Sequence, residues 1–125
     1  MKAAPEVRMT TDHTRQVVSG YRAACEAGDK QTAAGYLARR FSFESPLVRL
    51  DDPDSYLASH IAFQKVVTRT DLISELYGKG EATLLYDLHA PIPGGKQRTA
   101  EHYRLADGKI ESILLIFDTT PWRSG

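Results

Sequence analysis

The sequence predicts an α+β fold in which three N-terminal helices pack on a strongly curved, mainly antiparallel sheet. Helical periodicity fills most of the chain between residue 12 and about residue 65. Three alternating apolar segments then follow one another over residues 82–118, and Asp107-Gly108, a strong hairpin signal, joins the last two. Helices grouped ahead of an antiparallel sheet indicate two packed layers, here a cone with an apolar interior.

The length of the chain, 125 residues, is enough for one hydrophobic core and too short for two. We therefore expect a single domain over residues 11–125. Residues 1–10 show no apolar periodicity and are expected to form a flexible N-terminal tail.

Charge and composition argue against several classes of protein. Sixteen basic residues balance sixteen acidic ones, so no net field favours nucleic acid or an anionic membrane as a partner. No apolar run approaches the roughly 20 residues that span a bilayer, and the N-terminus lacks the apolar core of a signal peptide. A single cysteine, Cys25, excludes an intramolecular disulfide. We expect a cytoplasmic protein.

The first two helices follow from apolar spacing and capping residues. The first begins at Asp12 and ends at Gly28, and Asp29 can cap the second. A short strand over Phe41–Ser45 follows and is stopped by Pro46. The residues expected on the buried helix faces are Val17, Val18, Tyr21, Ala24 and Cys25 in the first helix, and Ala33, Tyr36 and Leu37 in the second.

The third helix has the most complete start signal, Asp52-Pro53-Asp54, with an N-cap acceptor and a proline at the first helical position. It runs to about Lys65, and Leu57, His60, Ile61 and Gln64 share one side. A strand near residues 71–77 and the turn at residues 78–80 lead into the closing meander. The longest loop, rich in proline and glycine, covers residues 91–95.

Glu101 is the principal candidate for chemistry, because it alternates in step with Tyr103 and Leu105 on the apolar face of a strand. Burying a carboxylate there is costly unless a partner or a function compensates for it. It is a general base or orienting carboxylate, a hydrogen-bond acceptor that ties strand to helix, or a rim residue that faces water. Tyr21 in the first helix either points at a ligand oxygen or is a core tyrosine bonded to the backbone.

His60 and the pair formed by Asp87 and His89 also allow two interpretations each. His60 shares a helix face with Leu57 and is either structural, which we favour, or catalytic. Asp87 and His89 lie on one strand face, where they form either a base with its orienting partner or an ordinary solvated surface.

Asp118 ends the last strand and either faces the pocket mouth or bonds the C-terminal turn. Its face depends on the register of the final hairpin. A two-residue turn places Glu101 opposite Leu114 and Asp118 on the face of Glu101. A three-residue bulged turn brings Ile113, Leu115 and Phe117 to that face instead.

Metal and nucleotide sites lack support. The four histidines are far apart, and no HExxH, CxxC or calcium-loop pattern occurs. The glycines at positions 78, 80, 94 and 95 belong to turns and do not lead from a strand into a helix, as a phosphate-binding loop does. We expect no metal and no cofactor.

Three segments, YRAACEAGD, FESP and AEHYRLADGKIESILLIFD, resemble SnoaL-like domains of the nuclear-transport-factor-two-like superfamily, to which ketosteroid isomerase also belongs. The resemblance covers about residues 12–120. It implies a cone-shaped α+β barrel, often a homodimer, with a pocket between the first helix and the sheet.

The resemblance also assigns roles to individual positions. Tyr21 falls at the oxyanion-hole tyrosine of ketosteroid isomerase, and Glu101 is similar in place to its second oxyanion-hole acid. Phe117 falls on a pocket-lining aromatic residue. The catalytic base of that enzyme falls at Ser45, and a serine cannot act as a base without help. Isomerisation would therefore require Glu44, Asp87 or Glu101 to supply the base.

Two functions therefore remain open. The first is a small enzyme, an isomerase, cyclase or hydrolase, that acts by acid–base chemistry on an apolar, oxygen-bearing molecule. The second is a non-catalytic ligand-binding or dimerisation domain, with a homodimer formed through the sheet. The catalytic candidates are Glu101, Tyr21, Asp118 and His60. The expected pocket lining is Phe43, Ser45, Tyr86, Tyr103, Ile113, Leu115 and Phe117.

Overall fold

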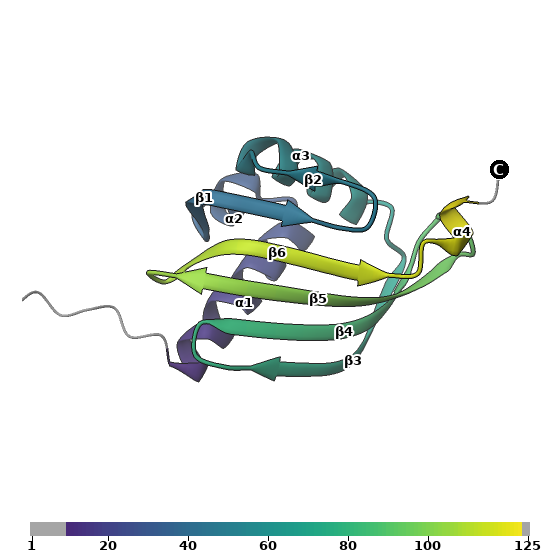
Figure 1. The fold of residues 1–125 in the computed structure, drawn as a ribbon. Helices are drawn as coiled ribbons and strands as arrows, with labels where there is room; N and C mark the ends of the chain where they lie inside the picture. The colour runs from purple at the N-terminus through teal and green to yellow at the C-terminus, as the bar shows by residue number, and fades with distance from the viewer. Residues whose placement is uncertain (1–9, 124–125) are drawn as a thin grey trace, which may run out of the picture.

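The computed structural model describes residues 10–123 and confirms the predicted α+β class (Figure 1). Three helices, α1 (Thr11–Glu26), α2 (Lys30–Ala34) and α3 (Pro53–Gln64), pack on a curved sheet that does not close on itself. A short helix, α4 (Thr120–Arg123), follows the last strand. No helix within residues 10–123 is long and apolar enough to cross a membrane.

The sheet contains six strands in the order β2-β1-β6-β5-β4-β3. Their bounds are β1 (Leu37–Glu44), β2 (Arg49–Leu50), β3 (Arg69–Tyr77), β4 (Glu81–His89), β5 (Lys96–Ala106) and β6 (Lys109–Phe117). Neighbouring strands run antiparallel except β1 and β6, which are parallel. The sheet is therefore mainly antiparallel, as predicted.

The second and third helices begin at the expected capping residues. The side chain of Asp29 accepts a hydrogen bond from the backbone N–H of Thr32 at 3.1 Å, and Asp52 accepts one from Ser55 at 3.1 Å. Each cap satisfies an N–H that the first turn of a helix leaves without an intrahelical partner. Thr10 caps α1 in the same way. The rest of the N-terminal tail expected over residues 1–10 lies outside the described residues.

The two layers enclose one core. Figure 1 shows α1 crossing one face of the sheet, while no helix of the described chain covers the opposite, outer face. Val18, Tyr21 and Cys25 of α1 are almost fully buried against this inner face. Thr14 fixes the other end of α1, because its hydroxyl accepts a hydrogen bond from the backbone N–H of Gly80 at 2.9 Å.

Three elements differ from the prediction. The second helix ends at Ala34, so Leu37 begins β1 instead of continuing the helical face. The backbone N–H of Ile110 donates to the carbonyl of Tyr36 at 2.8 Å, which draws this segment into the sheet. The two-residue strand β2 and the helix α4 were not predicted. Both are too short to produce a periodic pattern.

The final hairpin combines the two predicted alternatives. Its turn has two residues, Asp107 and Gly108, and both have positive φ, as the primed hairpin turns require. Glu111 then bulges out of β6, because Leu105 pairs with Ile110 whereas Arg104 pairs with Ser112. The bulge places Glu101 opposite Leu115. The face of Glu101 thus carries Ile113, Leu115 and Phe117, as in the second alternative.

Candidate functional site

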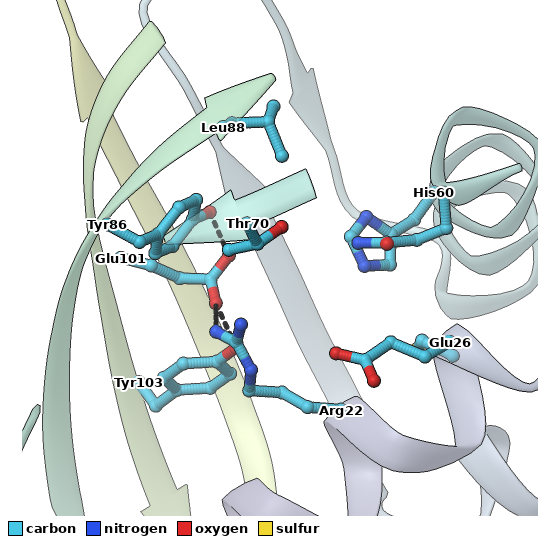
Figure 2. A pocket seen from close by; sticks show the side chains of 10 residues that line it. Arg22, Glu26, His60, Thr70, Tyr86, Leu88, Glu101 and Tyr103 are labelled. Atoms are coloured by element: carbon cyan, nitrogen blue, oxygen red, sulfur yellow. Dashed lines mark hydrogen bonds and ion pairs between the residues drawn. The ribbon is translucent and has the colours of Figure 1, made fainter. Parts of the chain in front are cut away.

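Glu101 lies in the middle of β5 on the inner face of the sheet, and 5% of its surface is exposed. Three side chains donate hydrogen bonds to its carboxylate: Arg22 at 3.0 Å, Tyr86 at 3.1 Å, and Tyr103. Figure 2 shows these three converging on Glu101 from α1, β4 and β5. An ionised carboxylate is an acceptor only, so three donors compensate for much of the cost of burying it.

The electrostatics of this cluster follow from burial and from one neighbouring cation. Burial raises the pKa of Tyr86 and Tyr103 well above the usual phenol value, so both keep the proton that they donate. The Arg22 guanidinium forms an ion pair with Glu101 and lies 5.4 Å from the centre of the Tyr86 ring. The Arg22 side chain is 24% exposed, so its outer part remains hydrated.

Sequence reasoning missed Arg22, although a signal for it exists. Arg22 stands four residues after Val18 and three before Cys25, both on the buried face of α1. Side chains at these spacings lie on one side of a helix. A charged residue beside that stripe, with a carboxylate expected on the facing strand, indicates an ion pair.

The space beside Glu101, named here the Glu101 cavity, is small. Its volume is about 20 Å³, which leaves room for roughly one water molecule. Figure 2 shows Glu26 of α1 and His60 of α3 pointing toward this space from the side opposite the sheet. Its lining residues are Arg22, Cys25, Glu26, His60, Gln64, Thr70, Tyr86, Leu88, Glu101 and Tyr103.

Tyr21 bonds a neighbouring tyrosine and does not contact Glu101. The hydroxyls of Tyr21 and Tyr56 are 2.7 Å apart and both rings are buried. His60 stacks on these two rings, with ring centres 5.4 Å from Tyr56 and 6.4 Å from Tyr21. The pairing of two phenols leaves the Tyr21 hydroxyl partnered within the protein.

His60 is neutral at physiological pH. Burial among aromatic rings lowers its pKa, an effect that the charge of Glu101 opposes and that of Arg22 reinforces. A neutral imidazole has one donor and one acceptor nitrogen. His60 lines the Glu101 cavity and also a second, larger cavity, and it is the one residue that the two share within the described chain.

This second space, named here the apolar cavity, lies between α3, the β1–β2 hairpin, β6 and α4, and has a volume of about 360 Å³. Leu47, Val48 and Trp122 at its rim are exposed. Its apolar side chains are Phe43, Leu47, Val48, Leu50, Phe63, Leu115, Phe117 and Trp122.

The structure separates the pocket-lining residues predicted from the sequence. Phe43, Ser45, Leu115 and Phe117 line the apolar cavity, whereas Tyr86 and Tyr103 line the Glu101 cavity. Ile113 is fully buried and lines neither of these two cavities.

Two predicted positions are engaged in turns. The hydroxyl of Ser45 accepts hydrogen bonds from the backbone N–H groups of Leu47 and Val48, both at 3.2 Å. The exposed carboxylate of Asp118 accepts hydrogen bonds from the backbone and the hydroxyl of Thr120, at 2.9 and 2.7 Å. Asp118 thus bonds the C-terminal turn, the second of the two readings predicted for it.

Asp87 and His89 do not pair with each other. Asp87 is held by two hydrogen bonds from Arg98, at 2.9 and 3.0 Å. His89 bonds Asp71 at 3.0 Å. Asp87 is 8% exposed and His89 is half-buried, so the pair forms neither a base with its orienting partner nor an ordinary solvated strand face. In the part of the chain that the structure describes, no group of three or more His, Cys, Asp or Glu side chains could hold a metal ion.

Comparison with known proteins bears on the fold. No family model and no curated protein matches the chain. Solved structures do match. A protein from Kribbella flavida is 26% identical, with a TM-score of 0.74, over 91% of this chain and 90% of that one. An NTF2-like protein of unknown function from Cytophaga hutchinsonii is 18% identical, with a TM-score of 0.72, over 97% and 98% of the two chains.

Another matching protein, from Sinorhizobium meliloti, is described as a candidate polyketide cyclase. It is 16% identical, with a TM-score of 0.70, over 80% of this chain and 93% of that one. Identities this low establish architecture and leave activity open. The helices on a curved, open six-stranded sheet and these matches agree: this chain has the nuclear-transport-factor-two-like fold.

Proposed function

We propose that this protein binds a small apolar, oxygen-bearing molecule in the apolar cavity. The mainly apolar and aromatic lining of that cavity, together with its volume of about 360 Å³, carries the proposal. Pockets for small molecules usually measure roughly 300–1,000 Å³ and are lined mainly by hydrophobic and aromatic side chains. The Glu101 cavity, at about 20 Å³, is too small for such a ligand.

Glu101 has a structural role in this proposal. Its two carboxylate oxygens already accept three hydrogen bonds, and these donors come from one helix and two strands. A general base must lie within hydrogen-bond reach of the substrate proton, and the cavity beside Glu101, at about 20 Å³, has no room for a substrate. Glu101 therefore ties α1 to the inner face of the sheet, the role of a hydrogen-bond acceptor between strand and helix that was one of those predicted for it.

A second candidate is acid–base catalysis in the apolar cavity, with His60 as the base. Its neutral imidazole lines the cavity, which supports this candidate. One matching structure is described as a candidate polyketide cyclase and another, from Kribbella flavida, as a candidate ketosteroid isomerase. Turnover of an unconjugated ketosteroid that His60→Phe abolishes would support an isomerase. Equal turnover by both proteins would remove His60 from that role.

Ligand binding is tested by titrating the protein with 2-naphthol and following the indole N–H of Trp122 by NMR. Trp122 is the single tryptophan of the chain and lines the apolar cavity, so its signal reports on this site. We expect a saturable shift. Ser59→Phe fills the cavity from α3 and should weaken binding at least about tenfold.

The matched control is Ala58→Phe, an exposed neighbour on α3 that does not line the cavity. It should bind as the wild type does. Absence of any shift in the wild-type protein, or equal binding by the Ser59→Phe protein, would refute the proposal.

The outer face of the sheet supports a homodimer. Leu85, Ala100 and Ile116 lie side by side across β4, β5 and β6, and Ile116 is 59% exposed. Contiguous exposed apolar side chains on a sheet mark an interaction surface. Pairing of two copies through this face would cover them.

A cytoplasmic location belongs to the same proposal, because one free cysteine is compatible with a reducing compartment.

A further inference from the structure

We propose that His60 selects the ligand of the apolar cavity, and that this ligand is an uncharged molecule whose hydroxyl or carbonyl group hydrogen-bonds the His60 imidazole. This inference rests on the proposed function, since it names the ligand class of the same site. It follows from a comparison of every polar side chain that lines the cavity: Ser45, Tyr56, Ser59, His60 and Gln97.

Three of these five side chains already have partners. The Ser45 hydroxyl is held in its turn by backbone N–H groups. The Tyr56 hydroxyl bonds that of Tyr21 at 2.7 Å. The amide of Gln97 accepts from the Trp122 indole N–H at 2.9 Å and donates to the Thr99 hydroxyl at 3.3 Å. A ligand would have to break one of these bonds to use any of the three.

Ser59 and His60 remain. Ser59 lines the cavity but is exposed, so water competes for its hydroxyl. His60 is half-buried and stacks on Tyr56 and Tyr21, within 10° of parallel to each ring. Within residues 10–123, neither ring nitrogen of His60 forms a hydrogen bond with the protein. Two flat contacts thus fix the orientation of a ring that borders both cavities and whose nitrogens accept or donate no hydrogen bond within the described residues.

The charge of the lining limits the ligand further. No Asp, Glu, Lys or Arg among the described residues lines the apolar cavity. The nearby charges of Arg22 and Glu101 are paired with each other in the Glu101 cavity. A ligand carboxylate or ammonium would lose its hydration and gain no counter-charge, which is costly. An alcohol, a phenol or a ketone loses less and gains one hydrogen bond.

A neutral His60 imidazole can hydrogen-bond either a hydroxyl or a carbonyl group of the ligand. Its N–H can donate to a carbonyl, and its other nitrogen can accept from a hydroxyl. Burial keeps the pKa of His60 low, which maintains this dual capacity at neutral pH. A protonated imidazole would only donate.

Three probes of one shape test the inference: naphthalene, 2-naphthol and 2-naphthoate, each titrated at pH 7.5 and followed at the Trp122 indole signal. We expect the wild-type protein to bind 2-naphthol roughly threefold to tenfold more tightly than naphthalene. This ratio of affinities corresponds to the net contribution of one neutral hydrogen bond. We expect 2-naphthoate to bind at least about tenfold more weakly than 2-naphthol.

Variants then locate the hydrogen bond. His60→Phe keeps a stacked ring without nitrogen and should abolish the preference for 2-naphthol while still binding naphthalene. His60→Gln keeps a polar donor and acceptor and should retain part of the preference. Ser59→Ala is the matched control in the same cavity and should behave as the wild type does. The NMR spectrum of each variant verifies its fold.

The outcomes are distinguishable. Loss of the preference in His60→Phe and its retention in Ser59→Ala support the inference. A preference that survives in His60→Phe, or 2-naphthoate binding as tightly as 2-naphthol, overturns the inference and leaves the proposed function standing. Failure of all three probes to bind the wild-type protein overturns both.

Discussion

Replacing Glu101 by glutamine tests whether this carboxylate holds the two layers together. The variant removes the charge that faces Arg22, and it turns one acceptor oxygen into a donor among three donors. Hydrogen bonds to charged groups contribute about 1.5–3 kcal/mol each. Breaking a buried ion pair costs roughly 3–5 kcal/mol. Because Arg22 is 24% exposed and the glutamine oxygen still accepts, we expect a loss of about 2–4 kcal/mol.

The assay is urea unfolding followed by circular dichroism. The matched control is Glu75→Gln, which removes the partner of Arg15 in an ion pair of similar length, 2.8 Å, whose side chains are 53% and 35% exposed. Exposed pairs contribute less than about 1 kcal/mol. The free energy of unfolding should therefore fall much further in Glu101→Gln than in Glu75→Gln. Equal losses in the two variants would refute a structural role for Glu101.

Four further outcomes are expected. Burial lowers the pKa of His60 in the folded state, so protonation favours the unfolded chain and the protein should lose stability as pH falls below about 6.5. Urea unfolding at pH 7.5 and 5.5 should show a smaller loss in His60→Phe than in the wild type. An unchanged loss would contradict this. Gly20→Ala places a Cβ 2.3 Å from the Tyr36 hydroxyl, so the ring must shift, and the usual gain of about 0.5–1 kcal/mol for alanine in a helix should be lost in urea unfolding but should appear in the Tyr36→Leu background. Ile116→Asp should convert a dimer to a monomer in sedimentation, whereas a monomeric wild-type protein would rule out the sheet interface. Burial raises the pKa of the Cys25 thiol to about 11, so a thiol reagent should label it only after unfolding.

Local signals in the sequence were enough to predict most elements. The three residues Asp52-Pro53-Asp54 are enough to specify the start of a helix, and Asp107-Gly108 is enough to specify a two-residue turn. Elements that depend on contacts between distant segments were not predictable in this way. Leu37 continues a helical spacing, yet the sheet takes it into β1. The bulge at Glu111 depends on how β6 fits between β5 and β1, which no pattern within β6 encodes.

The candidate site also contains features that local sequence predicts and features that depend on tertiary packing. Strand alternation predicted that Glu101 faces the interior, because the period of a strand is a local property. Its principal partner, Arg22, is 79 residues away, so the ion pair depends on tertiary packing. The separation of the apolar cavity from Glu101 also depends on packing, since His60 of α3 stacks on Tyr21 of α1 and Tyr56 of α3 hydrogen-bonds it.

A crystal structure of the protein with 2-naphthol would show whether the ligand occupies the apolar cavity or the Glu101 cavity. We predict the naphthalene ring beside Phe63 and Trp122, with its hydroxyl within hydrogen-bond distance of a His60 nitrogen and the Arg22–Glu101 pair intact. A naphthol molecule beside Glu101, with Arg22 displaced, would contradict the account.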